Sequence, residues 1–151
     1  MTDNSLTDSK PPPRGNGVLQ RKLALLSDQL LKLQSHLREV SREEFRESWA
    51  LRSMTERALQ VAIEIMIDIS ERIIAIENAG PAATAGEALL ALVRLQVLRD
   101  VQPYRDMIKF RNLLVHQYAE INPDFLYAIA TEKLDDFRAF RSEIDLWTAN
   151  A

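Results

Sequence analysis

The sequence contains no cysteine in its 151 residues, only two histidines and four glycines, and few aromatic residues (7%). Without cysteine the chain can form neither a disulfide framework nor a thiolate metal site, so a reducing compartment is compatible with it. It also has no glycine-rich phosphate loop, no nucleophile elbow and no internal repeat. These absences argue against P-loop enzymes, elbow-type serine hydrolases and repeat proteins.

Long uncharged hydrophobic runs are absent as well. The most apolar stretch, residues 58–76, is interrupted by Glu64, Asp68, Glu71 and Arg72. A membrane-spanning helix needs roughly 20 consecutive, mostly apolar residues, and charges near its centre are costly. The first residues carry neither the basic nor the apolar segment of a signal peptide. We therefore expect a cytoplasmic protein that does not enter a membrane.

The charge of the chain is weakly negative, with 19 Lys and Arg against 22 Asp and Glu and a net charge of −3. This balance by itself argues mildly against a nucleic-acid partner. Residues 87–118 nevertheless hold five basic and three acidic side chains, whereas residues 119–151 hold three basic and seven acidic ones. A phosphate backbone would bind where the basic side chains are in excess, although a bias of this size is most often only a solvated face.

Apolar residues recur at helical spacing along most of the chain. Between residues 18 and 40 they lie alternately four and three residues apart, which predicts an amphipathic helix. Further helices are expected at 41–78, 84–98, 103–118 and 122–147. The sequence thus predicts an all-α protein, an antiparallel four-helix bundle with one additional short helix. Residues 1–17, with three consecutive prolines, are expected to be a disordered leader before a single domain at 18–151.

The helix expected at 41–78 is apolar nearly all the way round in its middle, at 61–69. A helix of this kind is buried on more than one side, and in a small domain we expect the extra face to contact a second copy of the chain. Glu64 and Asp68, one turn apart here, are costly to bury unless they are paired or hydrogen bonded. They could pair with an arginine or border a functional cleft. No third ligand is visible nearby, so we expect no metal site.

One of the two histidines lies in the string Phe-Arg-Asn-Leu-Leu-Val-His-Gln-Tyr at 110–118, which has the spacing R-x4-H-x-Y. At ~100° per residue, Asn112 and His116 share one helix face, and Arg111 nearly eclipses Tyr118. Arg111 and His116 are instead about 140° apart, so both cannot point into one core. They could line the two walls of a cleft.

An arginine and a histidine can together support cleavage of RNA by its own 2′-hydroxyl without a metal. Histidine suits either proton-transfer role near neutral pH, and arginine binds phosphate oxygens with two parallel hydrogen bonds. Asn112 could fix the tautomer of the His116 ring. A purely structural explanation is also open. Arg111 could pair with Glu64, Asp68 or Asp106, His116 could stabilise the negative end of its helix, and Tyr118 could be a packing residue.

The full string, placed in the fourth helix of an all-helical chain, resembles the signature of the HEPN superfamily and most closely that of the HepT-like ribonuclease toxins. The likeness covers about residues 20–147. It implies a metal-independent endoribonuclease that uses Arg111 and His116 at a dimer cleft, needs no cofactor and cleaves structured RNA such as tRNA. It also implies the toxin of a type VII-like toxin–antitoxin pair. The partner in such a pair is a minimal nucleotidyltransferase antitoxin, which silences the nuclease by transferring AMP to the tyrosine that corresponds to Tyr118.

A second class of function is a non-catalytic helical module that scaffolds a nucleotidyltransferase or binds a nucleotide in the same cleft. The combination of Arg111, His116 and Tyr118 favours catalysis, because a scaffold has no physical need for all three. A small nucleotidyltransferase encoded beside this gene would favour the toxin–antitoxin pair.

Overall fold

The computed structural model describes residues 16–116 and 121–150, and its regular secondary structure in these ranges is entirely helical. The helices are α1 (Asn16–Leu37), α2 (Arg42–Glu47), α3 (Trp49–Ile76), α4 (Ala85–Arg94), α5 (Tyr104–His116), α6 (Pro123–Glu132) and α7 (Leu134–Ala149). None of them is long and apolar enough to cross a bilayer. The predicted all-α class is confirmed.

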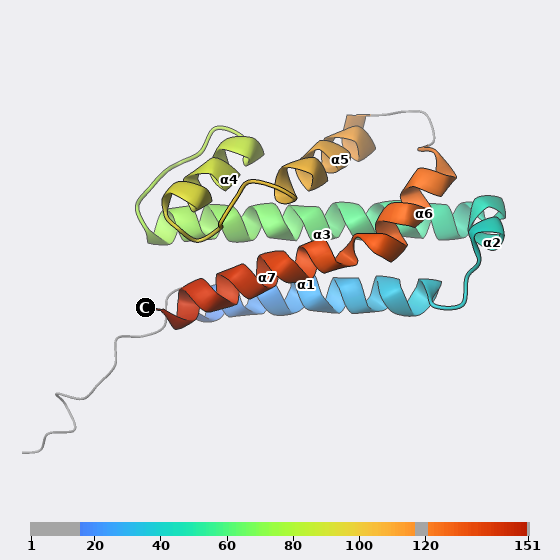
Figure 1. The fold of residues 1–151 in the computed structure, drawn as a ribbon, viewed down its shortest axis with the longest axis horizontal. Helices are drawn as coiled ribbons and strands as arrows, with labels where there is room; N and C mark the ends of the chain where they lie inside the picture. The colour runs from blue at the N-terminus through green and yellow to red at the C-terminus, as the bar shows by residue number, and fades with distance from the viewer. Residues whose placement is uncertain (1–15, 117–120, 151) are drawn as a thin grey trace, which may run out of the picture.

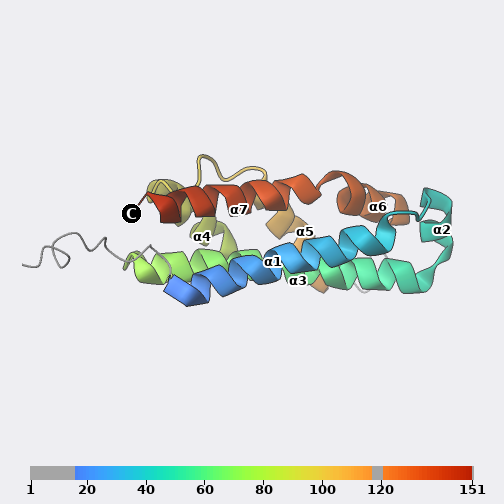
Figure 2. The ribbon, with the colours of Figure 1, turned by 90° about the horizontal axis from the view of Figure 1, so that it is seen from below.

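Helix α3 is the centre of the molecule and contacts α1, α2, α4, α5 and α6. Figure 1 shows α1 and α3 running side by side along the molecule, with the short α2 at the turn between them. Helices α4 and α5 follow one another along α3, and α6 and α7 follow one another along α1 (Figures 1 and 2). The result is a four-helix bundle in which two of the four helical positions are each filled by two shorter helices.

The prediction of a single helix at 41–78 is wrong, because Ser48 separates two helices, α2 and α3. The Ser41 hydroxyl accepts a hydrogen bond from the backbone N–H of Glu44 (3.1 Å) and caps α2. The Ser48 hydroxyl accepts one from the N–H of Leu51 (3.1 Å) and begins α3. The two caps lie seven residues apart, and the short α2 between them connects α1 to α3.

Other predicted helices also differ from the observed ones. Helix α4 ends at Arg94 rather than at residue 98, because Gln96 takes a left-handed conformation (φ 62°) that cannot continue a helix. The helix predicted at 122–147 is interrupted at Lys133. Helix α1 begins at Asn16, so the predicted leader boundary at 17 falls inside a helix. The rest of the leader, residues 1–15, lies outside the described residues.

The apolar middle of α3 is covered within a single chain. Ile63, Met66 and Ile69 are 1%, 0% and 0% exposed, and of the apolar residues at 61–69 only Val61 and Ile65 are partly exposed. Helices of the same chain thus bury most of this segment, and only Val61 and Ile65 offer apolar surface for a second copy of the chain. The dimer itself stays a prediction.

A buried tyrosine fastens the start of α5 to α7. The Tyr104 hydroxyl donates a hydrogen bond to one carboxylate oxygen of Glu143, and the other oxygen accepts from the backbone N–H of Arg99 (2.9 Å). The Tyr104 ring packs edge-on against Phe140 at 5.3 Å. Burial raises the pKa of Tyr104 above its usual value, and the hydrogen bond to Glu143 raises it further. These contacts fix the direction in which α5 leaves the preceding loop.

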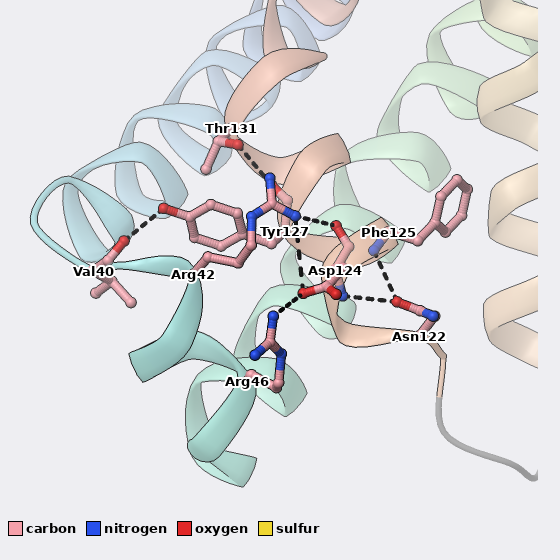
Figure 3. Close-up of polar contacts among 8 residues, drawn as sticks. All are labelled: Val40, Arg42, Arg46, Asn122, Asp124, Phe125, Tyr127 and Thr131. Atoms are coloured by element: carbon pink, nitrogen blue, oxygen red, sulfur yellow. Dashed lines mark hydrogen bonds and ion pairs between the residues drawn. The ribbon is translucent and has the colours of Figure 1, made fainter.

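At the opposite end of the molecule, Asp124 in the first turn of α6 fastens that helix to α2 (Figure 3). Its carboxylate lies 3.0 Å from Nη2 of Arg46 and 3.9 Å from Nη1 of Arg42. The Arg42 guanidinium also lies over the Tyr127 ring at 5.2 Å, and the Tyr127 hydroxyl donates to the backbone carbonyl of Val40 (2.7 Å). The elements on both sides of residues 117–120 are thus anchored to the bundle.

Candidate functional site

Helices α3 and α5 enclose an open cleft of about 450 Å³, called here the Arg111 cleft. Arg111 enters it from α5, and carboxylates spaced three or four residues apart enter it from α3. The lining residues are Gln60, Glu64, Ile67, Asp68, Glu71, Arg111 and Val115. One arginine therefore faces an acidic wall across a space that is open to solvent.

The Arg111 guanidinium faces these carboxylates without pairing with them. Its Nη1 donates a hydrogen bond to Oδ1 of Asn112 (3.0 Å), while its Nε is shielded from solvent and has no partner among the described residues. No ion pair within 4.0 Å joins Arg111 to Glu64 or Asp68. The structural explanation, in which Arg111 serves as the ion-pair partner of these acids, is wrong. Most of its donors are free to bind an anion.

The acidic wall has its own polar contacts. Oε1 of Glu64 accepts a hydrogen bond from Nε2 of Gln60 (3.2 Å), and a carboxylate oxygen of Asp68 lies 3.9 Å from Nζ of Lys22. The structure thus brings both predicted supporting acids to the same cleft as Arg111. Within residues 16–116 and 121–150, no group of three or more His, Asp or Glu side chains is placed to hold a metal ion.

His116, the last residue of α5, is exposed and does not line the Arg111 cleft, where Val115 stands instead. Among the described residues of one chain, Arg111 and His116 therefore do not line this cleft together, and a site that combines them stays a prediction. The Asn112 amide oxygen accepts a hydrogen bond from Nη1 of Arg111, and among the described residues Asn112 forms no hydrogen bond with the His116 ring. Tyr118 lies outside the described residues.

A second open cleft, of about 570 Å³, lies on the opposite flank of α5, between that helix and α6 and α7. We call it the Phe125 cleft. Its walls are apolar and its rim is charged; the lining residues are Leu59, Ile63, Pro103, Asp106, Met107, Lys109, Phe110, Leu113, Phe125, Ile129, Lys133, Asp136 and Phe137. Sequence reasoning missed this cleft, because the helical spacing of its apolar residues predicts ordinary core packing. No sequence signal distinguishes it from core.

Comparison with known proteins decides the family. Residues 26–144 match the family model described as Ribonuclease HepT-like. The chain belongs to the ribonuclease HepT-like family. The resemblance inferred from residues 110–118 is thereby confirmed.

Two curated relatives of this HepT-like chain are nucleases. It is 25% identical over 133 residues to the tRNA nuclease HepT of Aphanizomenon flos-aquae (strain 2012/KM1/D3), covering 85% of this chain and 88% of that protein. It is also 25% identical over 129 residues to the mRNA nuclease HepT of Shewanella oneidensis, covering 83% and 94% of the two chains. The two relatives are therefore named for different RNA substrates.

Solved structures share the fold. One is a toxin–antitoxin with AMP-PNP, which has a TM-score of 0.77 and 23% identity and covers 87% of this chain and 99% of its own. Another is a tri-AMPylated Shewanella oneidensis HEPN toxin in complex with MNT antitoxin, with a TM-score of 0.77, 24% identity and coverage of 87% and 98%. The bundle described above is the fold of these HEPN toxins.

Proposed function

We propose that this HepT-like protein is a metal-independent endoribonuclease that cleaves RNA with Arg111 and His116. The observation that carries the proposal is Arg111 itself, which lies in an open cleft with its donors uncommitted to the carboxylates opposite. An arginine that only stabilised the fold would pair with those acids. Membership of a family named for ribonuclease activity supports the same conclusion.

In the proposed reaction, the 2′-hydroxyl of the RNA attacks the adjacent phosphorus. The bond from phosphorus to the 2′-oxygen forms, the bond to the 5′-oxygen breaks, and the products are a 2′,3′-cyclic phosphate and a 5′-hydroxyl. One histidine takes the 2′-proton or protonates the leaving oxygen. Arg111 binds the non-bridging oxygens, whose negative charge grows in the transition state. A water molecule can carry out the proton transfer that the histidine does not.

A homodimer would complete this site. Within one chain His116 lies outside the Arg111 cleft, so both groups reach one phosphate most simply when a second chain supplies a histidine. A symmetric interface at the α5 ends would create two equivalent sites. The half-exposed Val115 (45%), next to His116 at the mouth of the cleft, suits such an interface.

Glu64 and Asp68 act in this proposal as positioning residues. Their charges attract the Arg111 guanidinium toward the cleft without forming an ion pair that RNA would have to break. The same charges repel phosphate groups that enter the cleft anywhere except at Arg111. Asn112 holds Arg111 from the side through the 3.0 Å hydrogen bond.

We further infer that this nuclease is the toxin of a type VII-like toxin–antitoxin pair that acts in the cytoplasm, with tRNA as its substrate. The solved toxins that share its fold include toxin–antitoxin complexes and a tri-AMPylated toxin. The corresponding partner here is a minimal nucleotidyltransferase that transfers AMP to Tyr118 and silences the nuclease. Co-expression with that partner should increase the mass of the Tyr118 peptide by one or more adenylyl groups. A fully neutralised pair with unmodified Tyr118 would show that inhibition needs only binding.

The test of the nuclease is cleavage of end-labelled tRNA by the purified protein with and without EDTA. We expect cleavage in both conditions and products that end in a 2′,3′-cyclic phosphate. Loss of cleavage in EDTA that Mg²⁺ restores would contradict the metal-free mechanism. Tight RNA binding without any cleavage would favour the non-catalytic binding module.

A further inference from the structure

One wall of the Phe125 cleft is aromatic and partly exposed to solvent. The Phe110 and Phe125 rings meet edge-to-face at 5.9 Å, and Phe125 is 51% exposed. The other four phenylalanines of the chain are at most 7% exposed. The Asn122 side chain accepts hydrogen bonds from the backbone N–H groups of Asp124 (2.9 Å) and Phe125 (3.2 Å), which fixes the first turn of α6. Figure 3 shows the ring directed away from Asp124.

The rim of this cleft carries the charges that a nucleotide needs. Lys109 and Lys133 line it, both are exposed, and neither forms an ion pair with another residue of 16–116 or 121–150. Asp106 and Asp136 stand beside them. Lysines bind phosphates, while carboxylates accept hydrogen bonds from the exocyclic amino groups of adenine, cytosine and guanine. Uracil has no such group.

The Phe125 cleft and the proposed reaction site at Arg111 share helix α5. Phe110 and Arg111 are neighbours on α5, yet they point into the clefts on its two opposite flanks. A single strand that crosses this helix, which is about 10 Å wide, can place one phosphate at Arg111 and a nearby base in the Phe125 cleft. The volume of about 570 Å³ lies within the usual range of ligand sites.

We propose that the Phe125 cleft binds one unstacked base of the RNA substrate and prefers a base with an exocyclic amino group. The base stacks on Phe125, its amino group donates a hydrogen bond to Asp106 or Asp136, and the flanking phosphates bind Lys109 and Lys133. This inference rests on the proposed ribonuclease function and names a specificity site for it. A partner protein helix could also fill an apolar groove, but unpaired lysines beside the phosphate site fit a nucleotide better.

The experiment measures binding of a fluorescein-labelled, 2′-O-methylated RNA, which cannot be cleaved, to the full-length protein. Removing the ring in Phe125→Ala should raise the Kd about tenfold, as for other base-stacking aromatics, whereas Phe125→Tyr should bind like the wild type. Leu146→Ala, which removes another exposed apolar side chain (64%), is the matched control and should change nothing. Circular dichroism checks that each variant is folded.

An abasic position in the RNA makes the test specific. Scanning it along the oligonucleotide should find one position that weakens binding to the wild type but not to Phe125→Ala, and uracil there should bind more weakly than the other bases. If the wild type cleaves RNA while Phe125→Ala binds with unchanged affinity and abasic profile, the base site is refuted and the nuclease stands. A Phe125→Ala variant that loses only antitoxin binding would assign the cleft to the partner protein. Failure of the wild type to bind or cleave any RNA would overturn both proposals.

Discussion

Replacement of Arg111 is the perturbation that tests the proposed catalytic site most directly. Of the five N–H donors of its guanidinium, one binds Asn112, and no carboxylate of residues 16–116 or 121–150 binds the others. Two of them can therefore bind the non-bridging phosphate oxygens. Each charge-assisted hydrogen bond contributes about 1.5–3 kcal/mol, so Arg111→Ala removes about 3–6 kcal/mol of transition-state stabilisation.

This loss corresponds to a decrease in kcat/KM of roughly 10²- to 10⁴-fold, because 1.36 kcal/mol is a factor of ten. Arg111→Lys keeps the charge but cannot form two parallel hydrogen bonds to the phosphate, so its kcat/KM should lie between those of the wild type and Arg111→Ala. Asn112→Ala keeps the guanidinium but removes its hydrogen bond to Asn112, so we expect kcat/KM to decrease roughly tenfold at most.

The assay is single-turnover cleavage of end-labelled tRNA, followed beside thermal denaturation of each variant. Arg111 forms no ion pair with the acidic wall, so its loss should change the free energy of unfolding by less than about 1 kcal/mol. The reasoning is refuted if Arg111→Ala cleaves at the wild-type rate. It is also refuted if the variant loses activity only because it unfolds.

Three further predictions concern stability and the acidic wall. Tyr104→Phe should lower the free energy of unfolding by about 1–3 kcal/mol at neutral pH in urea titrations. Folding raises the pKa of Tyr104, so the unfolded state ionises first and wild-type stability should fall above about pH 10; the variant should lack this loss. Asp124→Ala should cost about 1 kcal/mol or less in thermal denaturation, because its link to Arg46 is half exposed; a larger loss would mean that α6 detaches. Glu64→Gln should lower kcat roughly fivefold without raising KM, and an unchanged kcat would remove its positioning role.

The sequence by itself determined the fold class and the family. Apolar residues at helical spacing predict the bundle, because an amphipathic helix must bury one face wherever its partners lie. Caps such as Ser41 and Asn122 mark helix starts, because their side chains bind backbone N–H groups only a few residues away. The string at 110–118 identified the family because the arginine, histidine and tyrosine that make up the pattern lie close together in the sequence.

Only the tertiary structure decided how these residues meet. Whether Glu64 pairs with Arg111 or merely faces it depends on the packing of α5 on α3, which helical periodicity does not contain. The same packing buries Ile69 within one chain, so most of the apolar middle of α3 is covered without a second copy. It also leaves Phe125 uncovered beside Phe110, although both residues have the spacing of core. Local patterns fix which face of each helix is apolar, but the crossing of the helices fixes which part of that face stays open.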